Sequence, residues 1–239
     1  MWLIHSSIGR KLVMSISGIV LLLFLLFHLC MNVAAVFSAE AYNTICALLG
    51  ANWYAVAATV VLAGIIVLHF VYATMITLQN RKARGNDHYA VNKRAKGVSW
   101  ASQNMFVIGI IVLGFMVLHF SQFWYKMMFA ELLGRHEVLL CDGSVVHPQD
   151  GAAYVRYYFS HLWVVIAYLI WYAAIWFHLT HGIWSAIQTI GWSNRIWLKR
   201  WKFIGNIVAT LVMLGFAFVT LFFYAEAFAA EAVNNCWTF

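Results

Sequence analysis

Five long apolar stretches, separated by shorter polar intervals, dominate the pattern of the chain. They cover approximately residues 12–37, 53–78, 101–128, 157–190 and 203–228. An α-helix rises about 1.5 Å per residue, so about 20 apolar residues cross the roughly 30 Å of hydrocarbon in a bilayer. The strands of a membrane β-barrel would instead show about ten residues of alternating polarity. The pattern therefore predicts an all-α membrane protein, a bundle of five transmembrane helices formed by one domain over residues 1–239.

Composition agrees with a membrane location. Hydrophobic residues make up 64% of the chain and charged residues 10%, and the mean hydropathy is +0.80. These values are far from those of soluble globular domains, so we expect an integral, multi-pass membrane protein. The first apolar stretch is longer than the apolar core of a secretory signal and contains His28, so we expect it to be a retained anchor.

Positive charge is concentrated on one predicted side of the membrane, in clusters before the first span, between spans two and three, and between spans four and five. The clusters hold 12 of the 15 Lys and Arg residues: Arg10 and Lys11; Arg81, Lys82, Arg84, Lys93, Arg94 and Lys96; and Arg195, Lys199, Arg200 and Lys202. Cytoplasmic loops carry such an excess, so the N-terminus is predicted to be cytoplasmic and the C-terminus outside. This basic face could bind anionic lipid headgroups or a soluble partner.

Each of the first four spans contains a histidine within its apolar run: His28, His69, His119 and His178. Two of these histidines lie in related segments, VLAGIIVLHF at residues 61–70 and IVLGFMVLHF at residues 111–120. A single buried imidazole is often no more than a packing residue that hydrogen-bonds a neighbouring helix. Ionisable groups at membrane depth are costly and usually mark a function, so four of them on four helices indicate a shared role.

Depth along the spans sorts these histidines into two pairs. Measured from the cytoplasmic end of each span, His69 lies ~14 Å deep and His178 ~18 Å, whereas His28 lies ~24 Å and His119 ~27 Å deep. We call His69 and His178 the inner pair, and His28 and His119 the outer pair. Two imidazoles that face each other inside a helical bundle form a bis-histidine haem site, which transfers electrons and leaves no open position on the iron. The sequence thus predicts two haems that connect the two membrane faces.

The polar loops offer weaker candidates. Glu40 is the only charged residue of the first outer loop, where a quinone site would require a proton-accepting group. His136, His147 and Cys141 lie in the longest outer loop; they could bind a metal, but no HxxxH or CxxC spacing is present, and an ordinary loop is the favoured interpretation. The absence of CxxCH argues against covalent c-type haem.

In its order of features, the chain resembles the cytochrome b subunit of succinate dehydrogenase or fumarate reductase, in the single-subunit, five-helix, two-haem form. The resemblance rests on the SSIGRKLVMSISG segment, a histidine in each of the first four spans, the basic inner loops, and the stretch HLTHGIWSAIQTIGW. It implies two b haems and assigns the site residues as follows: His69 and His178 hold the proximal haem iron, His28 and His119 the distal haem iron, Arg10 and His181 are candidates for haem propionate contacts, and Glu40 is a candidate for the quinone site.

The resemblance also implies a setting. A flavoprotein and an iron-sulfur subunit would dock on the cytoplasmic face of a prokaryotic inner membrane and carry out the dicarboxylate chemistry, so no catalytic residue for that reaction is expected in this chain. Electrons would pass between the iron-sulfur subunit and a quinone, with menaquinone expected, and the whole complex could dimerise. Some members carry a glutamate two residues before the ligand on the fourth helix, whereas this chain has Trp176 there, which puts that route of proton movement in doubt.

Two other functions remain open at this stage. A di-haem cytochrome b subunit of a hydrogenase or formate dehydrogenase would also pair histidines, but it would have a different soluble partner and usually fewer spans. A transporter or proton channel would use the histidines as a proton relay. That function is less favoured, because the only proline, Pro148, lies in a loop and spans one to four contain no Asp or Glu.

Overall fold

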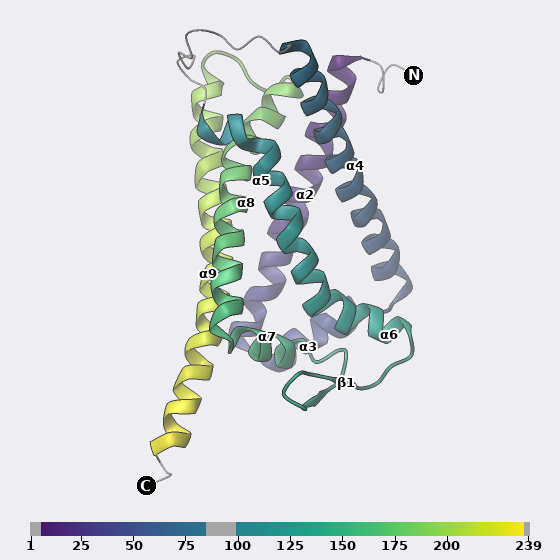
Figure 1. The fold of residues 1–239 in the computed structure, drawn as a ribbon, viewed down its shortest axis with the longest axis vertical. Helices are drawn as coiled ribbons and strands as arrows, with labels where there is room; N and C mark the ends of the chain where they lie inside the picture. Colours follow the sequence, from purple (N-terminus) through teal and green to yellow (C-terminus); the bar gives the residue numbers. More distant parts are fainter. Residues whose placement is uncertain (1–5, 85–98, 237–239) are drawn as a thin grey trace. The chain divides into compact units, whose positions relative to one another are not determined.

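The computed structural model describes residues 6–84 and 99–236, and within them five helices are long and apolar enough to cross a membrane (Figure 1). These five spans begin in or consist of the helices α2 (Ser7–Phe37), α4 (Trp53–Arg84), α5 (Trp100–His119), α8 (Leu162–Thr189) and α9 (Trp197–Cys236). The prediction of an all-α, multi-pass membrane protein is confirmed at this level. The basic residues Lys93, Arg94 and Lys96 lie outside the described residues.

Large apolar side chains on the spans are exposed. Val60, Val67, Val117 and Leu214 each expose more than 60% of their surface. In a soluble protein so many exposed aliphatic side chains would cause aggregation, whereas on a membrane helix they contact lipid. The exposure of these residues therefore supports the membrane location.

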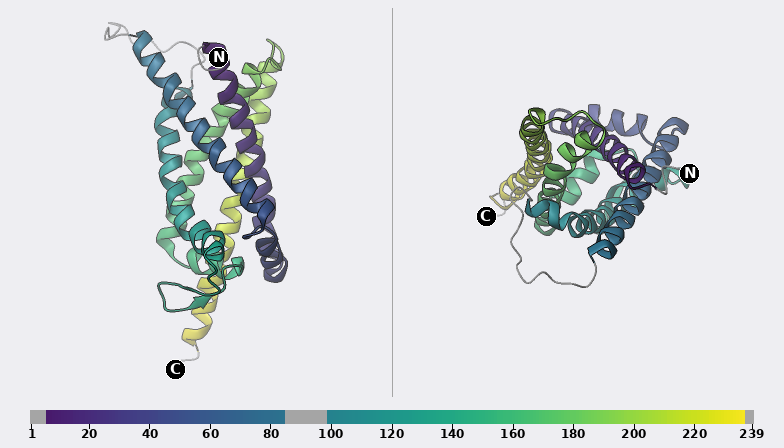
Figure 2. Two further views of the ribbon diagram at one scale, coloured as in Figure 1. Left: turned by 90° about the vertical axis from the view of Figure 1, so that its right-hand side faces the viewer. Right: turned by 90° about the horizontal axis from the view of Figure 1, so that it is seen from above.

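The third span changes its helical type immediately after His119. The α-helical hydrogen-bonding pattern ends at this residue, and a π-helix, η1 (Phe120–Phe129), continues into the short helix α6 (Ala130–Leu132) without a break in the ribbon (Figure 1 and Figure 2). π-Helices are rare, and they often occur at functional positions because the wider turn redirects the side chains that follow. Here the wider turn begins next to a candidate haem ligand.

Two short helices and a hairpin follow the ends of the spans. Helix α3 (Ala39–Leu48) follows α2, and the two-residue strands β1 (Val138–Leu139) and β2 (Val145–Val146) form an antiparallel pair. Helix α7 (Gly151–Phe159) then precedes α8, which begins at Leu162. The stretch that the sequence predicts as one long fourth span from residue 157 is therefore two helices separated by a turn, and this accounts for its unusual predicted length.

The chain forms two compact units, and every long span contributes to both. Unit 1 consists of Met1–Phe24, Val61–Ile111 and Ala174–Leu211, and unit 2 of Leu25–Val60, Val112–Ala173 and Val212–Phe239. The inner pair of histidines belongs to unit 1. The outer pair belongs to unit 2, together with α3, α7 and the hairpin.

Helices α8 and α9 are joined by polar contacts in each unit. In unit 1, the indole of Trp176 donates a hydrogen bond of 2.9 Å to Thr210 Oγ1, and a Cβ on Gly205 would lie 3.3 Å from Ile183 Cβ. In unit 2, the Tyr172 hydroxyl lies 2.9 Å from the hydroxyl of the fully buried Thr220. In lipid such interhelical hydrogen bonds and close approaches replace the hydrophobic effect as the source of helix association.

Candidate functional site

The inner pair lies within unit 1, where His69 of α4 meets His178 of α8. The centres of the two imidazole rings are 6.2 Å apart, and the ring planes are inclined by 60°. Glycines lie close to both rings: a Cβ on Gly18 would lie 3.3 Å from His69 Cε1, and one on Gly109 would lie 3.8 Å from His178 Cε1. Small residues on α2 and α5 thus allow these helices to lie close to the two imidazoles.

One ring of the inner pair has a hydroxyl partner. Ser17 Oγ is buried, lies 3.0 Å from His69 Nδ1, and donates its own hydrogen to the carbonyl oxygen of Met14 over 3.0 Å. His178 Nδ1 is also buried, but it has no hydrogen-bond partner among the described residues. Most buried polar atoms in proteins have a hydrogen-bond partner, so the unpaired Nδ1 of His178 indicates that a further group could bind at this site.

The outer pair lies within unit 2, where His28 of α2 meets His119 at the end of α5. The ring centres are 5.9 Å apart and the planes are nearly perpendicular, at 86°. Aromatic rings surround the pair: Phe216 lies 5.8 Å from the His28 ring, and Phe123 and Trp171 lie 5.3 and 5.5 Å from the His119 ring. The outer pair therefore lies in an apolar, aromatic environment.

His119 also has a hydroxyl partner, which is a tyrosine. The Tyr168 hydroxyl lies 3.2 Å from His119 Nδ1 and donates a hydrogen bond of 2.8 Å to Gln122 Oε1. Tyr168 and Gln122 are both buried, with 3% and 5% of their surface exposed. Gln122 lies in the first turn of η1, so the π-helical segment brings its amide to the tyrosine.

Both pairs have dimensions that fit a bis-histidine haem. Two imidazole nitrogens bound at about 2 Å to one metal ion place their ring centres roughly 6 Å apart. The measured separations are 5.9 and 6.2 Å. Within the described part of the chain, no group of three or more His, Cys, Asp or Glu side chains could hold a metal ion. A bis-histidine haem needs only two protein ligands, because the macrocycle supplies the others.

The candidate propionate residues lie in the same unit as the inner pair. Arg10 is partly buried in α2, and the His181 ring packs edge-on against Trp184, with ring centres 4.8 Å apart. Lys202 places its ammonium 4.4 Å from the Trp184 ring, and His181 Nδ1 has no hydrogen-bond partner in the described chain. This side of unit 1 thus offers hydrogen-bond donors and positive charge to an anionic group.

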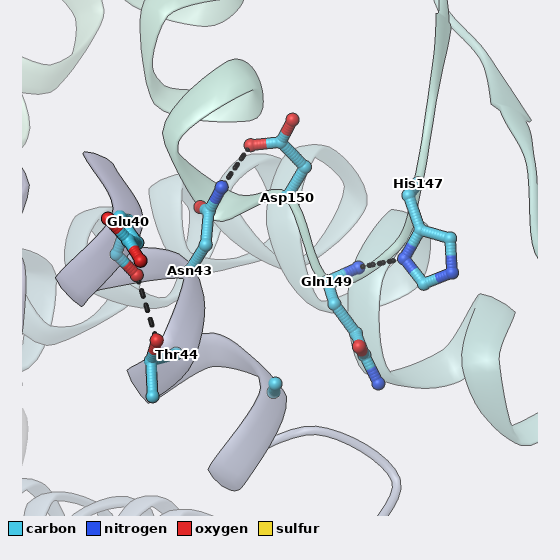
Figure 3. A pocket seen from close by; sticks show the side chains of 7 residues that line it. Glu40, Asn43, Thr44, His147, Gln149 and Asp150 are labelled. Carbon is cyan, nitrogen blue, oxygen red and sulfur yellow. Dashed lines mark hydrogen bonds between the residues drawn. The ribbon is translucent and has the colours of Figure 1, made fainter.

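Glu40 lines an open depression in unit 2, the unit that contains the outer pair (Figure 3). The volume of the depression is about 630 Å³, and its lining comes from α3 and from the chain just before α7: Glu40, Asn43, Thr44, Ala47, His147, Gln149 and Asp150. The side-chain amide of Asn43 donates a hydrogen bond of 2.7 Å to Asp150 across the depression. Carboxylates and an imidazole thus surround a space open to the exterior.

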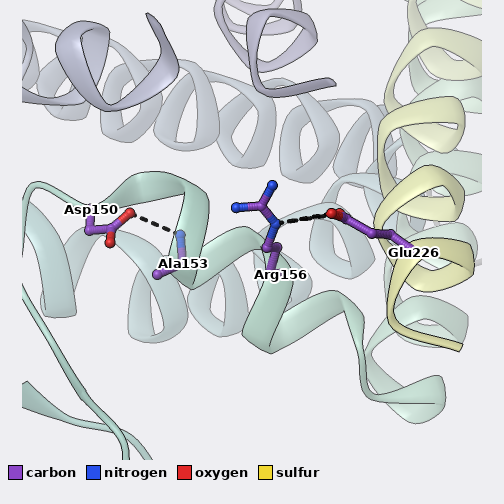
Figure 4. A network of polar contacts seen from close by, with 4 residues as sticks. All are labelled: Asp150, Ala153, Arg156 and Glu226. Carbon is purple, nitrogen blue, oxygen red and sulfur yellow. Dashed lines mark hydrogen bonds and ion pairs between the residues drawn. The ribbon is translucent and has the colours of Figure 1, made fainter. Parts of the chain in front are cut away.

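Helix α7, next to this depression, is fixed by polar contacts along its length (Figure 4). Asp150 caps its N-terminus by accepting a hydrogen bond of 3.1 Å from the Ala153 amide, and Arg156 pairs with Glu226 of α9 at 3.4 Å. Arg156 and Glu226 are both about half exposed, so their ion pair contributes little to stability and mainly orients the two helices.

Ser17, Tyr168 and Gln122 are not among the site residues that the sequence predicts. A sequence signal exists only in retrospect. Ser17 precedes His28 by eleven residues, and Tyr168 precedes His178 by ten. Each hydroxyl lies on a helix that also carries a candidate ligand, and in both cases the spacing is about three helical turns.

Comparisons of the chain with protein-family models, with curated proteins and with solved structures find no match. A function is therefore inferred from the chain's own residues. The two histidine pairs are the feature that most restricts it.

Proposed function

We propose that this chain is the membrane anchor and electron-transfer subunit of a succinate:quinone oxidoreductase, the class that includes succinate dehydrogenase and fumarate reductase. The observation that carries the proposal is the pairing of four intramembrane imidazoles, at 5.9 and 6.2 Å, by four different spans. When bound, two b haems would supply one-electron transfer between a quinone and an iron-sulfur partner.

In this proposal each pair of histidines would hold one haem iron. His69 and His178 would hold the proximal haem, and His28 and His119 would hold the distal haem. A haem held by two imidazoles would supply electron transfer and would not bind oxygen or substrate. Aromatic side chains pack around the outer pair, and the glycines near the inner pair allow α2 and α5 to lie close to the two imidazoles.

The polar candidates take supporting roles. Arg10 and His181 would hold haem propionates at the proximal site, where Lys202 would add positive charge. In unit 2, Glu40 and His147 line the depression where a quinone headgroup, expected to be that of menaquinone, exchanges protons with the exterior. Carboxylate and imidazole groups are suited to this exchange, because quinone reduction takes up protons and quinol oxidation releases them.

The soluble partners in this proposal are a flavoprotein and an iron-sulfur subunit, and the membrane is a prokaryotic inner membrane. The basic clusters support a cytoplasmic N-terminus and a cytoplasmic docking surface, since cytoplasmic loops carry an excess of Lys and Arg. Purification of the chain from its own membrane tests this part. Recovery of a flavoprotein with succinate or fumarate activity supports it, whereas recovery of a hydrogenase or formate dehydrogenase contradicts it.

The haem content of the purified chain tests the core of the proposal. We expect two b haems per wild-type chain in a pyridine haemochrome assay. His69→Ala and His119→Ala should each remove one haem, and the two lost haems should differ in the reduced-minus-oxidised spectrum. His136→Ala is the matched control, because it removes an exposed loop imidazole. A folded, membrane-inserted wild-type chain without haem would contradict the proposal.

A further inference from the structure

We propose that Ser17 and Tyr168 are positioning residues that determine which nitrogen of His69 and of His119 faces the iron, and that each tunes the reduction potential of one haem independently of the other. The inference rests on the proposed function, because it assumes that these two histidines are haem ligands. It assigns roles to two residues for which the pairing of the imidazoles alone predicts none.

The first step is to count hydrogens at the inner pair. A serine hydroxyl has one hydrogen to donate, and Ser17 donates it to the Met14 carbonyl, which can only accept. The contact of 3.0 Å between Ser17 Oγ and His69 Nδ1 is then a hydrogen bond only if the histidine donates. His69 therefore carries its hydrogen on Nδ1, and Nε2 keeps the lone pair that a metal ion requires.

The same count at the outer pair gives the same result with a different hydroxyl. Tyr168 donates its single hydrogen to Gln122 Oε1, so its oxygen accepts from His119 Nδ1. The hydrogen of His119 is thus also on Nδ1, and its Nε2 is available to iron. Both contacts are at least partly buried, so water does not compete strongly for the donors.

A partner on the second ring nitrogen has two consequences for a metal-bound histidine. It holds the ring orientation and the tautomer, and it makes the ligand more basic because the N–H bond is polarised toward the acceptor. A more basic ligand stabilises ferric iron relative to ferrous iron. Loss of either hydroxyl should therefore raise the potential of the haem that it serves and leave the other haem unchanged.

The test uses the full chain purified from its own membrane, with Ser17→Ala and Tyr168→Phe as the two variants. Each has a matched control. Ser17→Thr keeps a hydroxyl at the same place, and Tyr172→Phe removes a neighbouring buried phenol that contacts Thr220. Haem content is measured first by pyridine haemochrome. The midpoint potential of each haem then follows from an optical redox titration, and the low-spin ferric signals from electron paramagnetic resonance report the ligand field.

We expect Tyr168→Phe to shift the distal haem to a more positive potential and Ser17→Ala to shift the proximal haem in the same direction, with both controls close to wild type. Selective loss of the served haem, while the controls retain two, would also support the inference. Two retained haems with unchanged potentials in Ser17→Ala and Tyr168→Phe would overturn the inference but leave the proposed function standing. A wild-type chain without haem would overturn both.

Discussion

Replacing Asn43 by alanine should loosen the contact between α3 and α7 beside the Glu40 depression. The Asn43 side chain connects the two helices through both ends of its amide. It donates a hydrogen bond of 2.7 Å to Asp150 Oδ1 and accepts one of 2.9 Å from the backbone amide of Ala152. Alanine removes both bonds and leaves a partly buried amide N–H without its partner.

The expected magnitude follows from the two bonds. A hydrogen bond to a carboxylate contributes about 1.5 to 3 kcal/mol, and one between neutral groups about 0.5 to 1.5 kcal/mol. Because water replaces part of the loss at this partly exposed site, we expect opening of the α3–α7 contact to become easier by about 2 to 3 kcal/mol. This corresponds to a roughly 30- to 150-fold larger open population.

Amide hydrogen exchange of a peptide from α7, measured by mass spectrometry, reports this population. Asn43→Ala should accelerate exchange in that peptide. Thr44→Ala is the matched control, because Thr44 lines the same depression but its hydroxyl bonds only to a carbonyl of its own helix, at 2.9 Å. Equal protection of α7 in wild type and Asn43→Ala would refute the reasoning.

Asn43→Asp adds a pH signature to this prediction. It places a second carboxyl against Asp150, and when two carboxyls share a site, one of the two apparent pKa values of the pair is raised in the folded state. A raised folded-state pKa stabilises the fold below the unfolded-state pKa, and this contribution is lost as pH rises. Compared with wild type at the same pH, exchange in α7 of Asn43→Asp should therefore be faster than in Asn43→Ala near pH 7 and should approach the wild-type rate below about pH 4. The opposite pH dependence would contradict the assigned amide contact.

Three further predictions concern topology, the inner pair and a partly buried thiol. A membrane-impermeant maleimide should label the exposed Cys141 in intact cells, whereas a cysteine placed by Arg81→Cys should be labelled only after permeabilisation; the reverse result would invert the predicted orientation. Gly18→Val should remove or weaken the proximal haem and spare the distal one in difference spectra, because a Cβ at this position already lies 3.3 Å from His69 Cε1. Burial raises the pKa of the Cys46 thiol from 9.0 to about 11, so we expect its alkylation in the folded protein to be slow at pH 8 and to accelerate toward pH 11, and fast alkylation at pH 8 would show that the thiol is not buried.

The five spans and the pairing of the histidines could be predicted because both follow from two fixed dimensions, the thickness of the bilayer and the rise of an α-helix per residue. The bilayer thickness sets a minimum length for an apolar helix, and the constant rise per residue converts sequence position into depth. The structure brings together the same two pairs of rings that depth predicts. Their role as haem ligands stays a prediction.

Other features depend on quantities that a linear pattern does not contain. The turn at Ser160 and His161 lies within a stretch rich in aromatic residues, which length and hydropathy alone do not distinguish from one continuous span. The π-helix after His119 differs from an α-helix by one residue per hydrogen-bonded turn and has no compositional signature. The partnership of Ser17 with His69 depends on how α2 is rotated against α4, and hydrophobicity all around both helices leaves this rotation unspecified.

The repeated histidines of α4 and α5 have matching partners in the structure. The helices α2 and α8 supply these partners and exchange roles between the two units. In unit 1, the repeated histidine, His69, takes its hydroxyl partner from α2 and its imidazole partner from α8. In unit 2, His119 takes its hydroxyl partner from α8 and its imidazole partner from α2. Each of α2 and α8 therefore supplies one hydroxyl and one imidazole, about three turns apart. Chance packing would have no reason to pair the same nitrogen, Nδ1, with a hydroxyl twice, once with serine and once with tyrosine. The proposed haem ligation would account for the pattern, because it requires that Nε2 of both repeated histidines keep its lone pair.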